Sequence, residues 1–321
     1  PLACGNTVIL KASEQCPATH HLIGEVLQEA GFGGGIVNVI TNAPDNAADV
    51  VSALIAHPAV RRINFTGSTG VGKIIAEQAA KQLKPVLLEL GGKAPFLVLD
   101  DADIDAAVDA AIFGAFFNQG QICMSTERVI VDQRIADAFV DKFAARAKAL
   151  KAGGPRDERN TLGTLINAAS GEKLNGLIDD AVEKGAHIAA GGKAEGVVMQ
   201  ATVIDGVTSD MRLYSEESFG PVVAVIRVDS EEEAIRIAND SEYGLSSAVF
   251  SRDSARAMKV AGRLQTGICH INAPTVHDEP QMPFGGVKSS GYGRFGGKAG
   301  IEEFTELRWM TVQLGARHYP I

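Results

Sequence analysis

The sequence lacks the cysteine patterns that mark disulfide-stabilised and zinc-binding proteins. Among its 321 residues are only four cysteines, Cys4, Cys16, Cys123 and Cys269, and none of them forms a Cys-x-x-Cys pair or a zinc-type spacing with histidine. A disulfide framework is therefore not expected, and the usage fits a reducing cytoplasm. No metal site is implied.

Long apolar runs and basic clusters are also missing. The strongly apolar stretches are interrupted by Gly, Asp or Lys well before the roughly 20 residues that a membrane-spanning helix needs, and no signal peptide opens the chain. The net charge is -9, with scattered lysines and arginines, which predicts no surface for nucleic acid or anionic membranes. We expect a cytoplasmic protein with neither partner.

The composition and the alternation of strand-like and helix-like segments predict an α/β protein. The chain is 45% hydrophobic and 21% charged, and its length allows two domains. Strand-like segments at 7–11, 36–40 and 62–65 alternate with helix-like segments at 18–30, at 47–56 and from about residue 70. Such βαβ units predict parallel strands. Because the first strand follows Pro1 so closely, we expect the chain to start inside a domain.

A glycine-rich turn joins the strand at 62–65 to the next helix. Residues 65–72 read FTGSTGVG, and glycines there let backbone N–H groups approach an anion at a helix N-terminus. The spacing fits neither the G-x-G-x-x-G fingerprint nor a P-loop. A phosphate site and a plain loop both remain open from this segment alone.

One carboxylate lies inside an apolar run. Residues 86–92 read VLLELGG, which places Glu89 in a strand just before a double glycine. Ionisation of an unpaired carboxylate in such a place is costly, so its pKa should rise towards the value that a general base needs near neutral pH. The alternative is a glutamate that forms a salt bridge with a neighbour.

Cys123 lies between a predicted helix and an apolar run. Asp100 to Asp103 carry side chains that can cap a helix over 104–117, and this helix delivers the chain to the loop at 118–124. A cysteine there is either a reactive thiol or a small buried hydrophobe, and the window alone does not decide between them. Phe116 and Phe117 are expected in the core.

The second half of the chain predicts another alternating domain. Helices are expected at 135–149, 171–184 and 230–239, and strands near 203 and at 222–228, 239–250 and 266–272. His270 and His277 lie in or beside a proline-rich loop at 273–282 that precedes a PFGG turn. They suggest a Cys/His dyad, but a structural or solvated role is the preferred interpretation of both histidines.

Motifs along the chain carry a resemblance to a known family. LELGGK at 88–93 is followed, 34 residues after Glu89, by Cys123 at the end of QGQIC. KASE at 11–14, FTGS at 65–68, ESFGP at 217–221 and PFGGVKSSG at 283–291 occur in the same order. The sequence resembles the aldehyde dehydrogenase superfamily, and GYGRFGG at 291–297 is most similar to the branch that oxidises aromatic aldehydes such as salicylaldehyde or benzaldehyde.

The resemblance implies one residue for the oxidation step and another for the hydrolysis step. Cys123 would add to the aldehyde carbon and form a thiohemiacetal, from which hydride passes to NAD and a thioester remains. Glu89 would then activate the water that hydrolyses the thioester. The backbone N–H of Cys123 would be one donor to the oxyanion.

The resemblance also implies an NAD site. Its contacts would be Lys11 and Glu14 at the adenine-side ribose, Gly67 and Ser68 at the pyrophosphate, and Glu217 with Phe219 at the nicotinamide ribose. Glu14 favours NAD over NADP, because a carboxylate accepts hydrogen bonds from a free 2′-hydroxyl and repels a 2′-phosphate. Solvent exposure or a role at the entry of the following helix is the alternative for Glu14.

The implied architecture has three parts. Residues 1–91 would form a Rossmann-like NAD-binding domain, residues 92–302 an α/β catalytic domain, and residues 303–321 an oligomerisation strand and tail of a homodimer or homotetramer. Members of the family begin well before Pro1 and supply there more of the cofactor domain and an asparagine of the oxyanion hole, so we expect the NAD-binding domain to be incomplete at its N-terminus.

Two readings of a different kind stay open beside this one. One is a catalytically weak, dinucleotide-binding or structural relative, and the other is a CoA-acylating dehydrogenase, which Glu89 disfavours because it suits hydrolysis. Phe295 marks a further departure, since some relatives carry a carboxylate there that is thought to help proton exit. Proton handling in this chain is expected to differ from theirs.

Overall fold

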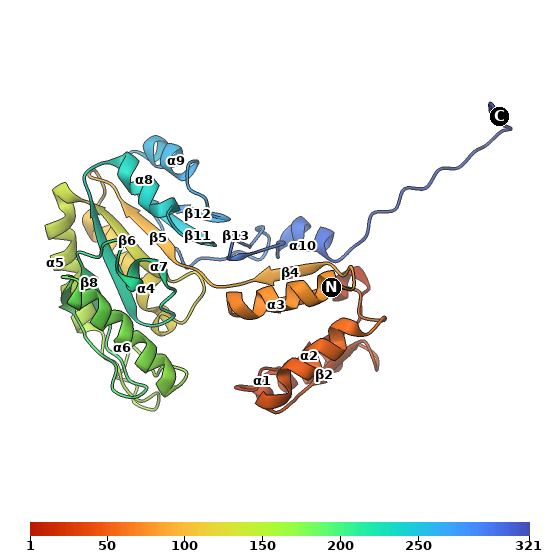
Figure 1. Ribbon diagram of the computed structural model, residues 1–321, viewed down its shortest axis with the longest axis horizontal. Helices are drawn as coiled ribbons and strands as arrows, with labels where there is room; N and C mark the ends of the chain where they lie inside the picture. Colours follow the sequence, from red (N-terminus) through yellow and green to blue (C-terminus); the bar gives the residue numbers. More distant parts are fainter.

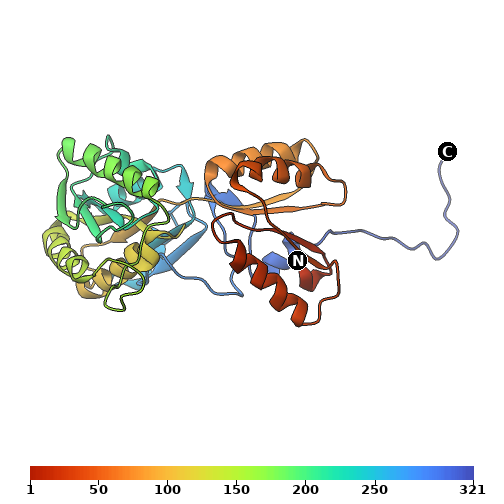
Figure 2. The same cartoon turned by 90° about the horizontal axis from the view of Figure 1, so that it is seen from below.

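The computed structural model describes residues 1–321 as two α/β bodies and an extended C-terminal tail (Figures 1 and 2). The first body is built mainly from the N-terminal part of the chain. Its elements are η1 (Leu2–Cys4), β1 (Val8–Lys11), α1 (Pro17–Glu29), β2 (Val37–Ile40), η2 (Pro44–Asn46), α2 (Ala47–Ala56), β3 (Ile63–Thr66), α3 (Thr69–Ala80) and β4 (Val86–Glu89).

Parallel strand pairs in the first body confirm the predicted βαβ units. β1 pairs with β2 and β3 pairs with β4, in both cases in parallel register. The two pairs lie in separate sheets. A short strand from much later in the chain, β14 (Gly291–Tyr292), adds to the second sheet by pairing antiparallel to β4.

The second body is organised by one seven-stranded sheet with the order β12-β11-β5-β6-β9-β8-β7. All neighbouring strands are parallel except β7 and β8. The strands are β5 (Ala94–Val98), β6 (Thr126–Asp132), β7 (His187–Ala190), β8 (Thr202–Asp205), β9 (Val222–Val228), β11 (Ser246–Phe250) and β12 (Ile268–Ile271).

Helices cover both faces of this sheet, and they account for its continuous apolar strands. α4 (Ile104–Phe116) and α5 (Gln133–Ala149) pack on one face together with Phe96 and Val98 of β5. The other face, with Leu97, is covered by α6 (Ala168–Glu183), α7 (Arg212–Ser215), α8 (Glu231–Asn239) and α9 (Ser254–Ala261). A strand buried on both faces needs apolar side chains in both directions.

The remaining elements are short. They are η3 (Phe117–Gly120), β10 (Tyr243–Gly244), β13 (Val287–Lys288) and α10 (Gly297–Glu303), and β10 pairs antiparallel with β13. None of the helices combines the length and hydrophobicity that a bilayer-spanning segment requires.

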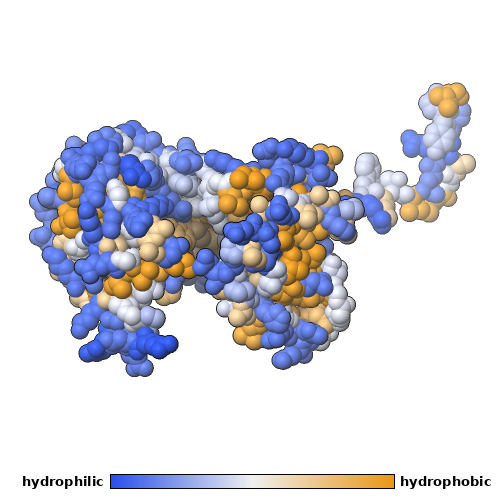
Figure 3. All heavy atoms as spheres, turned by 60° about the horizontal axis from the view of Figure 1, so that its bottom comes forward, coloured by the Kyte–Doolittle hydropathy of each residue, from blue (hydrophilic) through white to orange (hydrophobic).

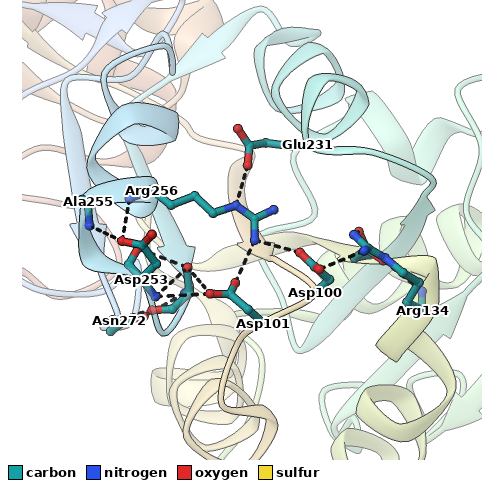
Figure 4. Close-up of polar contacts among 10 residues, drawn as sticks. Asp100, Asp101, Arg134, Glu231, Asp253, Ala255, Arg256 and Asn272 are labelled. Atoms are coloured by element: carbon teal, nitrogen blue, oxygen red, sulfur yellow. Dashed lines mark hydrogen bonds and ion pairs between the residues drawn. The ribbon is translucent and has the colours of Figure 1, made fainter.

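Capping side chains begin the central helix as the sequence predicts. Asp103 accepts a hydrogen bond from the backbone N–H of Ala106 at 3.2 Å, which satisfies a donor left free at the first turn of α4. Asp100 and Asp101 serve a different purpose and bind Arg256 of α9. The acidic run therefore caps α4 through Asp103, and its first two residues tie α9 to the end of β5 (Figure 4).

The C-terminal segment forms no strand within the chain. Residues 308–314, expected as a strand, pair with no strand of this chain, and the segment runs away from both bodies (Figures 1 and 2). The side chains of Trp309 and Leu314 are 89% and 95% exposed. No sheet edge of this chain lies beside the segment, so the oligomerisation strand stays a prediction.

The segment just before the tail returns to the first body. Besides the pairing of β14 with β4, Arg62 beside β3 forms an ion pair with Glu303 at the end of α10, and its guanidinium lies over the ring of Phe304 at 5.5 Å. Residues 291–303 thus pack with the N-terminal elements, although the sequence groups most of them with the catalytic domain.

Candidate active site

The loop that carries Cys123 has an unusual backbone. Asn118, Gln119 and Gly120 all lie in the left-handed region, with φ of 50°, 58° and 66°. Non-glycine residues rarely adopt this conformation, and it persists only where surrounding structure enforces it. A Cβ on Gly120 would lie 2.3 Å from the carbonyl oxygen of Gly220, so the Cys123 loop packs tightly against the loop at 217–220.

The double glycine after β4 contacts both other parts of the site. A Cβ on Gly92 would lie 2.2 Å from the carbonyl oxygen of Cys123, and one on Gly91 would lie 2.7 Å from Glu217 Oε1. The backbone N–H of Gly92 donates to Glu217 Oε1 at 2.8 Å. Only glycine permits these approaches. The end of β4, the Cys123 loop and Glu217 therefore meet at one place.

Glu89 is the last residue of β4 and lies two residues before that meeting point. Its exposed fraction is 3%, and neither carboxylate oxygen has a hydrogen-bond partner. Burial raises its pKa to about 8, and the positive charge of Arg294 only partly opposes this. The expected cost of ionisation is confirmed, and the alternative of a salt-bridged glutamate is not what the structure shows.

The thiol of Cys123 is half-buried in an acidic environment. Its pKa is raised to about 11, first by burial and then by the charges of Glu89 and Glu217, while hydrogen bonds from the backbone N–H groups of Cys123 and Met124 oppose the rise. At neutral pH the resting structure therefore holds a thiol and not a thiolate. A reaction that uses the thiolate must remove this proton.

Lys11 and Glu14 lie together at the carboxyl end of β1. They form an ion pair, and Asn42, just beyond β2, donates from Nδ2 to Glu14 Oε1 at 2.9 Å. The hydrogen bond from Lys11 is the main reason that the pKa of Glu14 falls to about 2. Glu14 is thus a partnered carboxylate and not simply exposed, and Asn42 is a member of this group that the motifs did not reveal.

Gly67 and Ser68 lie in the turn between β3 and α3, next to Glu89. The backbone N–H of Gly67 donates to the carbonyl of Glu89 at 3.0 Å. Ser68 is the N-cap of α3, and its hydroxyl accepts a hydrogen bond from the N–H of Val71 at 3.4 Å. The turn is therefore a capped helix N-terminus beside Glu89, as the glycine-rich motif indicates.

Glu217 and Phe219 occupy the loop that faces the double glycine. Burial raises the pKa of Glu217, and the neighbouring charge of Glu127 adds to the rise. Phe219 is 40% exposed and has a left-handed φ of 53°. A cavity of about 640 Å³ borders Glu217 and is also lined by Lys173 and Tyr243.

The predicted site residues fall into two groups. Cys123, Glu89, Gly67, Glu217 and Phe219 lie around the double glycine, whereas the pair formed by Lys11 and Glu14 is joined to them by no hydrogen bond. Lys11, Glu14, Gly67 and Glu89 come from the first body, whereas Cys123, Glu217 and Phe219 come from the second. The surface is hollowed between the bodies (Figure 3).

A buried ion pair in the site was not predicted. Lys93 Nζ and Glu127 Oε2 are 2.6 Å apart, and both side chains are almost fully buried. Lys93 belongs to the LELGGK motif, but the motif alone indicates no role for it. The signal that could have revealed Glu127 is a glutamate within an apolar strand, as for Glu89, although Glu127 lies near the start of β6 and Glu89 at the end of β4.

The structure also shows the surroundings of two phenylalanines and two histidines that the sequence singles out. Phe116 is buried as expected, but Phe117 is 53% exposed and stacks on Phe113 with ring centroids 4.9 Å apart, so its assignment to the core is wrong. The rings of His270 and His277 meet edge to face at 5.3 Å. No hydrogen bond links either histidine to Cys123.

The fold and the convergence of a cysteine, a buried glutamate and a double glycine are those of a known class of protein. Residues 1–310 match the sequence model of the aldehyde dehydrogenase family, and the chain belongs to this family.

Individual relatives narrow the comparison. Vanillin dehydrogenase of Pseudomonas fluorescens is 65% identical over 321 residues, which are 100% of this chain and 67% of that protein. The crystal structure of a salicylaldehyde dehydrogenase from Pseudomonas putida G7, complexed with salicylaldehyde, is 54% identical with a TM-score of 0.98, covering 100% of this chain and 66% of the other. An NAD-dependent aldehyde dehydrogenase from Sinorhizobium meliloti is 36% identical with a TM-score of 0.93, covering 98% and 62%.

The chain thus spans about two thirds of the length of the relatives it matches. The match extends through both bodies. It includes the segment with Cys123 and Glu89 and the segment with Lys11 and Glu14.

Proposed function

We propose that this protein oxidises an aromatic aldehyde to the carboxylic acid with NAD as the hydride acceptor. The observation that carries the proposal is the meeting of three chain segments at Gly91 and Gly92. Gly92 lies against the carbonyl of Cys123, Gly91 lies against the carboxylate of Glu217, and Glu89, two residues before Gly91, ends β4. This proximity supports the proposed roles of a nucleophile, a base and a carboxylate that binds a ribose.

Cys123 is the proposed nucleophile. As its sulfur adds to the aldehyde carbon, the thiol proton passes to a water molecule, and the oxyanion that forms accepts a hydrogen bond from the backbone N–H of Cys123. When bound, NAD accepts the hydride that the carbon loses. The carbon then remains attached to sulfur as a thioester, which is a reactive acyl donor.

Glu89 is the proposed general base for hydrolysis. Its pKa of about 8 lies close to the operating pH, where a base is most effective. Because its two oxygens have no protein partner, they are free to accept a proton from a water molecule. That water attacks the thioester carbon, the bond to sulfur breaks, and the acid and the thiol are released.

The cofactor preference rests on the group at the carboxyl end of β1. Dinucleotides bind beyond the carboxyl ends of strands in open α/β sheets, and Lys11, Glu14 and Asn42 lie there in mutual contact. The carboxylate of Glu14 would accept hydrogen bonds from ribose hydroxyls and repel a 2′-phosphate. We infer that Gly67 and Ser68 hold the pyrophosphate at the N-terminus of α3, and that Glu217 with Phe219 meets the second ribose.

The substrate class is inferred from the relatives. The names of two similar proteins refer to vanillin and to salicylaldehyde, both of which are benzaldehydes with oxygen substituents on the ring. We propose that a hydroxylated benzaldehyde is the substrate class of this chain too. The assembly we propose is a homodimer or homotetramer in which residues 308–314 pair with another copy, since their exposed apolar side chains lack a partner within the chain.

The proposal is tested by NADH formation from vanillin, salicylaldehyde and benzaldehyde. Wild type is expected to reduce NAD with these substrates and to use NADP poorly. The Cys123→Ala variant is expected to lose turnover, and Cys269→Ala, which changes a cysteine outside the site, is expected to keep it. Turnover that survives Cys123→Ala would remove Cys123 from the mechanism.

One observation favours a second candidate, a dinucleotide-binding protein with weak catalysis. The pKa of Cys123 at about 11 leaves little thiolate at neutral pH. In that case NAD would bind with an affinity measurable by calorimetry, while a broad panel of aldehydes would give no NADH.

A further inference from the structure

We propose that Glu127 is a positioning residue that holds the cofactor loop at 217–220 in its binding geometry, through a buried ion pair with Lys93. The inference rests on the proposed function, in which Glu217 and Phe219 meet the cofactor. Glu127 itself lies behind that loop, four residues after Cys123, and contacts no reacting group.

The contacts of Glu127 are concentrated on the cofactor loop. Its Oε2 accepts from the backbone N–H of Ser218 at 2.7 Å, and its Oε1 accepts from the N–H of Ser218 and of Phe219, both at 3.0 Å. Hydrogen bonds from N–H groups to a carboxylate are about twice as strong as neutral ones. One buried carboxylate therefore fixes two successive peptide groups, one on each side of Ser218.

Lys93 completes the arrangement from the opposite side. Its Nζ donates to Glu127 Oε2 at 2.6 Å and to the hydroxyl of Ser218 at 3.1 Å. The residue before it, Gly92, donates its own N–H to Glu217 Oε1 at 2.8 Å. The chain that follows the proposed base thus contacts the cofactor loop at two successive residues.

These contacts act on a strained segment. Phe219 is held at a φ of 53°, a conformation that costs of order 1 to 3 kcal/mol for a residue other than glycine. It persists only when neighbouring groups impose it, and the hydrogen bond from its own N–H to Glu127 is a direct way to impose it. Without Glu127, Phe219 and the adjoining Glu217 are free to relax away from the cofactor.

The ion pair between Lys93 and Glu127 is almost completely buried, unlike a surface salt bridge. The exposed fractions are 1% for Lys93 and 3% for Glu127. Burial lowers the pKa of Lys93, and the charge of Glu127 opposes that fall. Buried pairs of this kind seldom add stability over an apolar replacement, so a role in geometry is the better explanation of why the chain contains one here.

The first experiment measures the rate of hydrogen exchange in the cofactor loop, with no cofactor added. Hydrogen exchange of the peptide covering 216–221 is compared in wild type and Glu127→Gln. The amides of Ser218 and Phe219 are expected to exchange at least about tenfold faster in the variant, since their acceptor is weakened. Asp205→Asn is the matched control, because it breaks a partly buried ion pair with Arg227 at the carboxyl end of β8, whereas the loop at 217–220 precedes the amino end of the neighbouring β9. It should leave this peptide unchanged.

The second experiment measures cofactor use. Glu127→Gln is expected to lower kcat/KM for NAD about tenfold or more, because small displacements of binding groups have effects of this size. The double variant Glu127→Gln with Glu217→Gln should lose less than the product of the two single losses, since Glu127 acts through Glu217 and its neighbour. Losses that multiply would show independent action and overturn the proposal.

A second variant, without any buried charge at this place, keeps the test valid if Glu127→Gln does not fold. Glu127→Gln leaves the Lys93 charge buried without its partner, whereas Lys93→Met combined with Glu127→Gln leaves no buried charge. This double variant is expected to fold and to show the same loss for NAD and the same faster exchange. A folded protein with unchanged exchange at 216–221 and unchanged kcat/KM for NAD would contradict the positioning role.

The two proposals fail in different ways. If wild type neither binds NAD nor oxidises aldehydes, the proposed function fails, while the exchange measurement still reports whether Glu127 holds the loop. If wild type is active and Glu127→Gln matches it in both measurements, only the positioning role is wrong.

Discussion

Glu89 is the residue whose environment has the clearest chemical consequence. It is buried, its oxygens have no partner, and its pKa is raised to about 8 by burial. Below that pH it is a neutral acid and cannot accept a proton. Above it, the carboxylate is present and can act as a base. The pH dependence of hydrolysis should therefore follow this one group.

The first prediction concerns the hydrolytic step. Single-turnover release of the acid from the acylated protein should rise about tenfold per pH unit below about pH 8 and level off above it, because the rate follows the fraction of ionised Glu89. Glu89→Gln should be slow and show no such rise. A profile with the same inflection in wild type and Glu89→Gln would assign the inflection to another group.

The ionised carboxylate of Glu89 makes ionisation of the Cys123 thiol harder. The charge of Glu89 contributes to raising the pKa of the thiol, but this charge exists only above about pH 8. Below that pH, wild type and Glu89→Gln should therefore differ little in thiolate content. Above it, the variant has no nearby carboxylate at this position and should form thiolate more readily.

The second prediction is drawn from that difference. Alkylation of Cys123 by iodoacetamide should be faster in Glu89→Gln than in wild type at pH 9, and the two rates should converge near pH 6. Peptide mass spectrometry identifies the modified cysteine, and Cys16, an exposed thiol, provides an internal reference. Equal rates at both pH values would mean that Glu89 does not influence the thiol.

The third prediction concerns the contact between Gly92 and the Cys123 carbonyl. A Cβ at this position would be 2.2 Å from that oxygen, so Gly92→Ala must displace the Cys123 loop. We expect a loss of kcat/KM on the order of a hundredfold, as for a shift of about 1 Å in a catalytic group. Gly154→Ala, where nothing lies within 4 Å, should retain wild-type activity.

At the level of secondary structure, an ion-pair network joins two helices to the end of β5 in the seven-stranded sheet. Arg256 of α9 binds Asp100 at 2.8 Å and Asp101 at 3.1 Å after β5, and Glu231 at 2.7 Å in α8 (Figure 4). Its side chain is 29% exposed. Three elements that are distant in sequence are thereby held by one guanidinium.

The fourth prediction follows from this network. Arg256→Gln should lower the free energy of unfolding by on the order of 1 kcal/mol or more, since three charge-assisted contacts are lost together. Arg252→Gln is the control, because its nearest carboxylate, on Asp103, is 3.9 Å away and its side chain is 72% exposed. Denaturant unfolding that gives equal midpoints for both variants would show that the network contributes little.

Most helices and strands could be predicted because their sequence patterns are local. The helix expected at 47–56 matches α2, and the strand at 222–228 matches β9. Two-residue strands such as β13 and β14 carry no periodic pattern and were missed. α9 was also missed, since only Ala257 and Val260 of its eight residues are buried. The alternating residues at 308–314 predicted a strand, but pairing depends on an edge that this chain does not offer them.

At the level of the whole molecule, the sequence motifs identified the residues that meet but not how they are held. Glu89 and Cys123 lie in motifs with a fixed order, so they could be found. Glu127 is separated by 91 and 92 residues of chain from Ser218 and Phe219, and only the fold brings it behind Phe219. The return of β14 to the first body is likewise a tertiary feature that no local pattern encodes. The domain limits at 91 and 302 stay a prediction.

The proposed mechanism depends on a covalent intermediate on Cys123. Its most direct test is the intact mass of Glu89→Gln after mixing with NAD and vanillin, followed by peptide mapping. The account predicts one aroyl group per chain, attached to Cys123, together with a burst of NADH of about one equivalent. NADH formation without an adduct, or an adduct on Cys4, Cys16 or Cys269 instead, would contradict it.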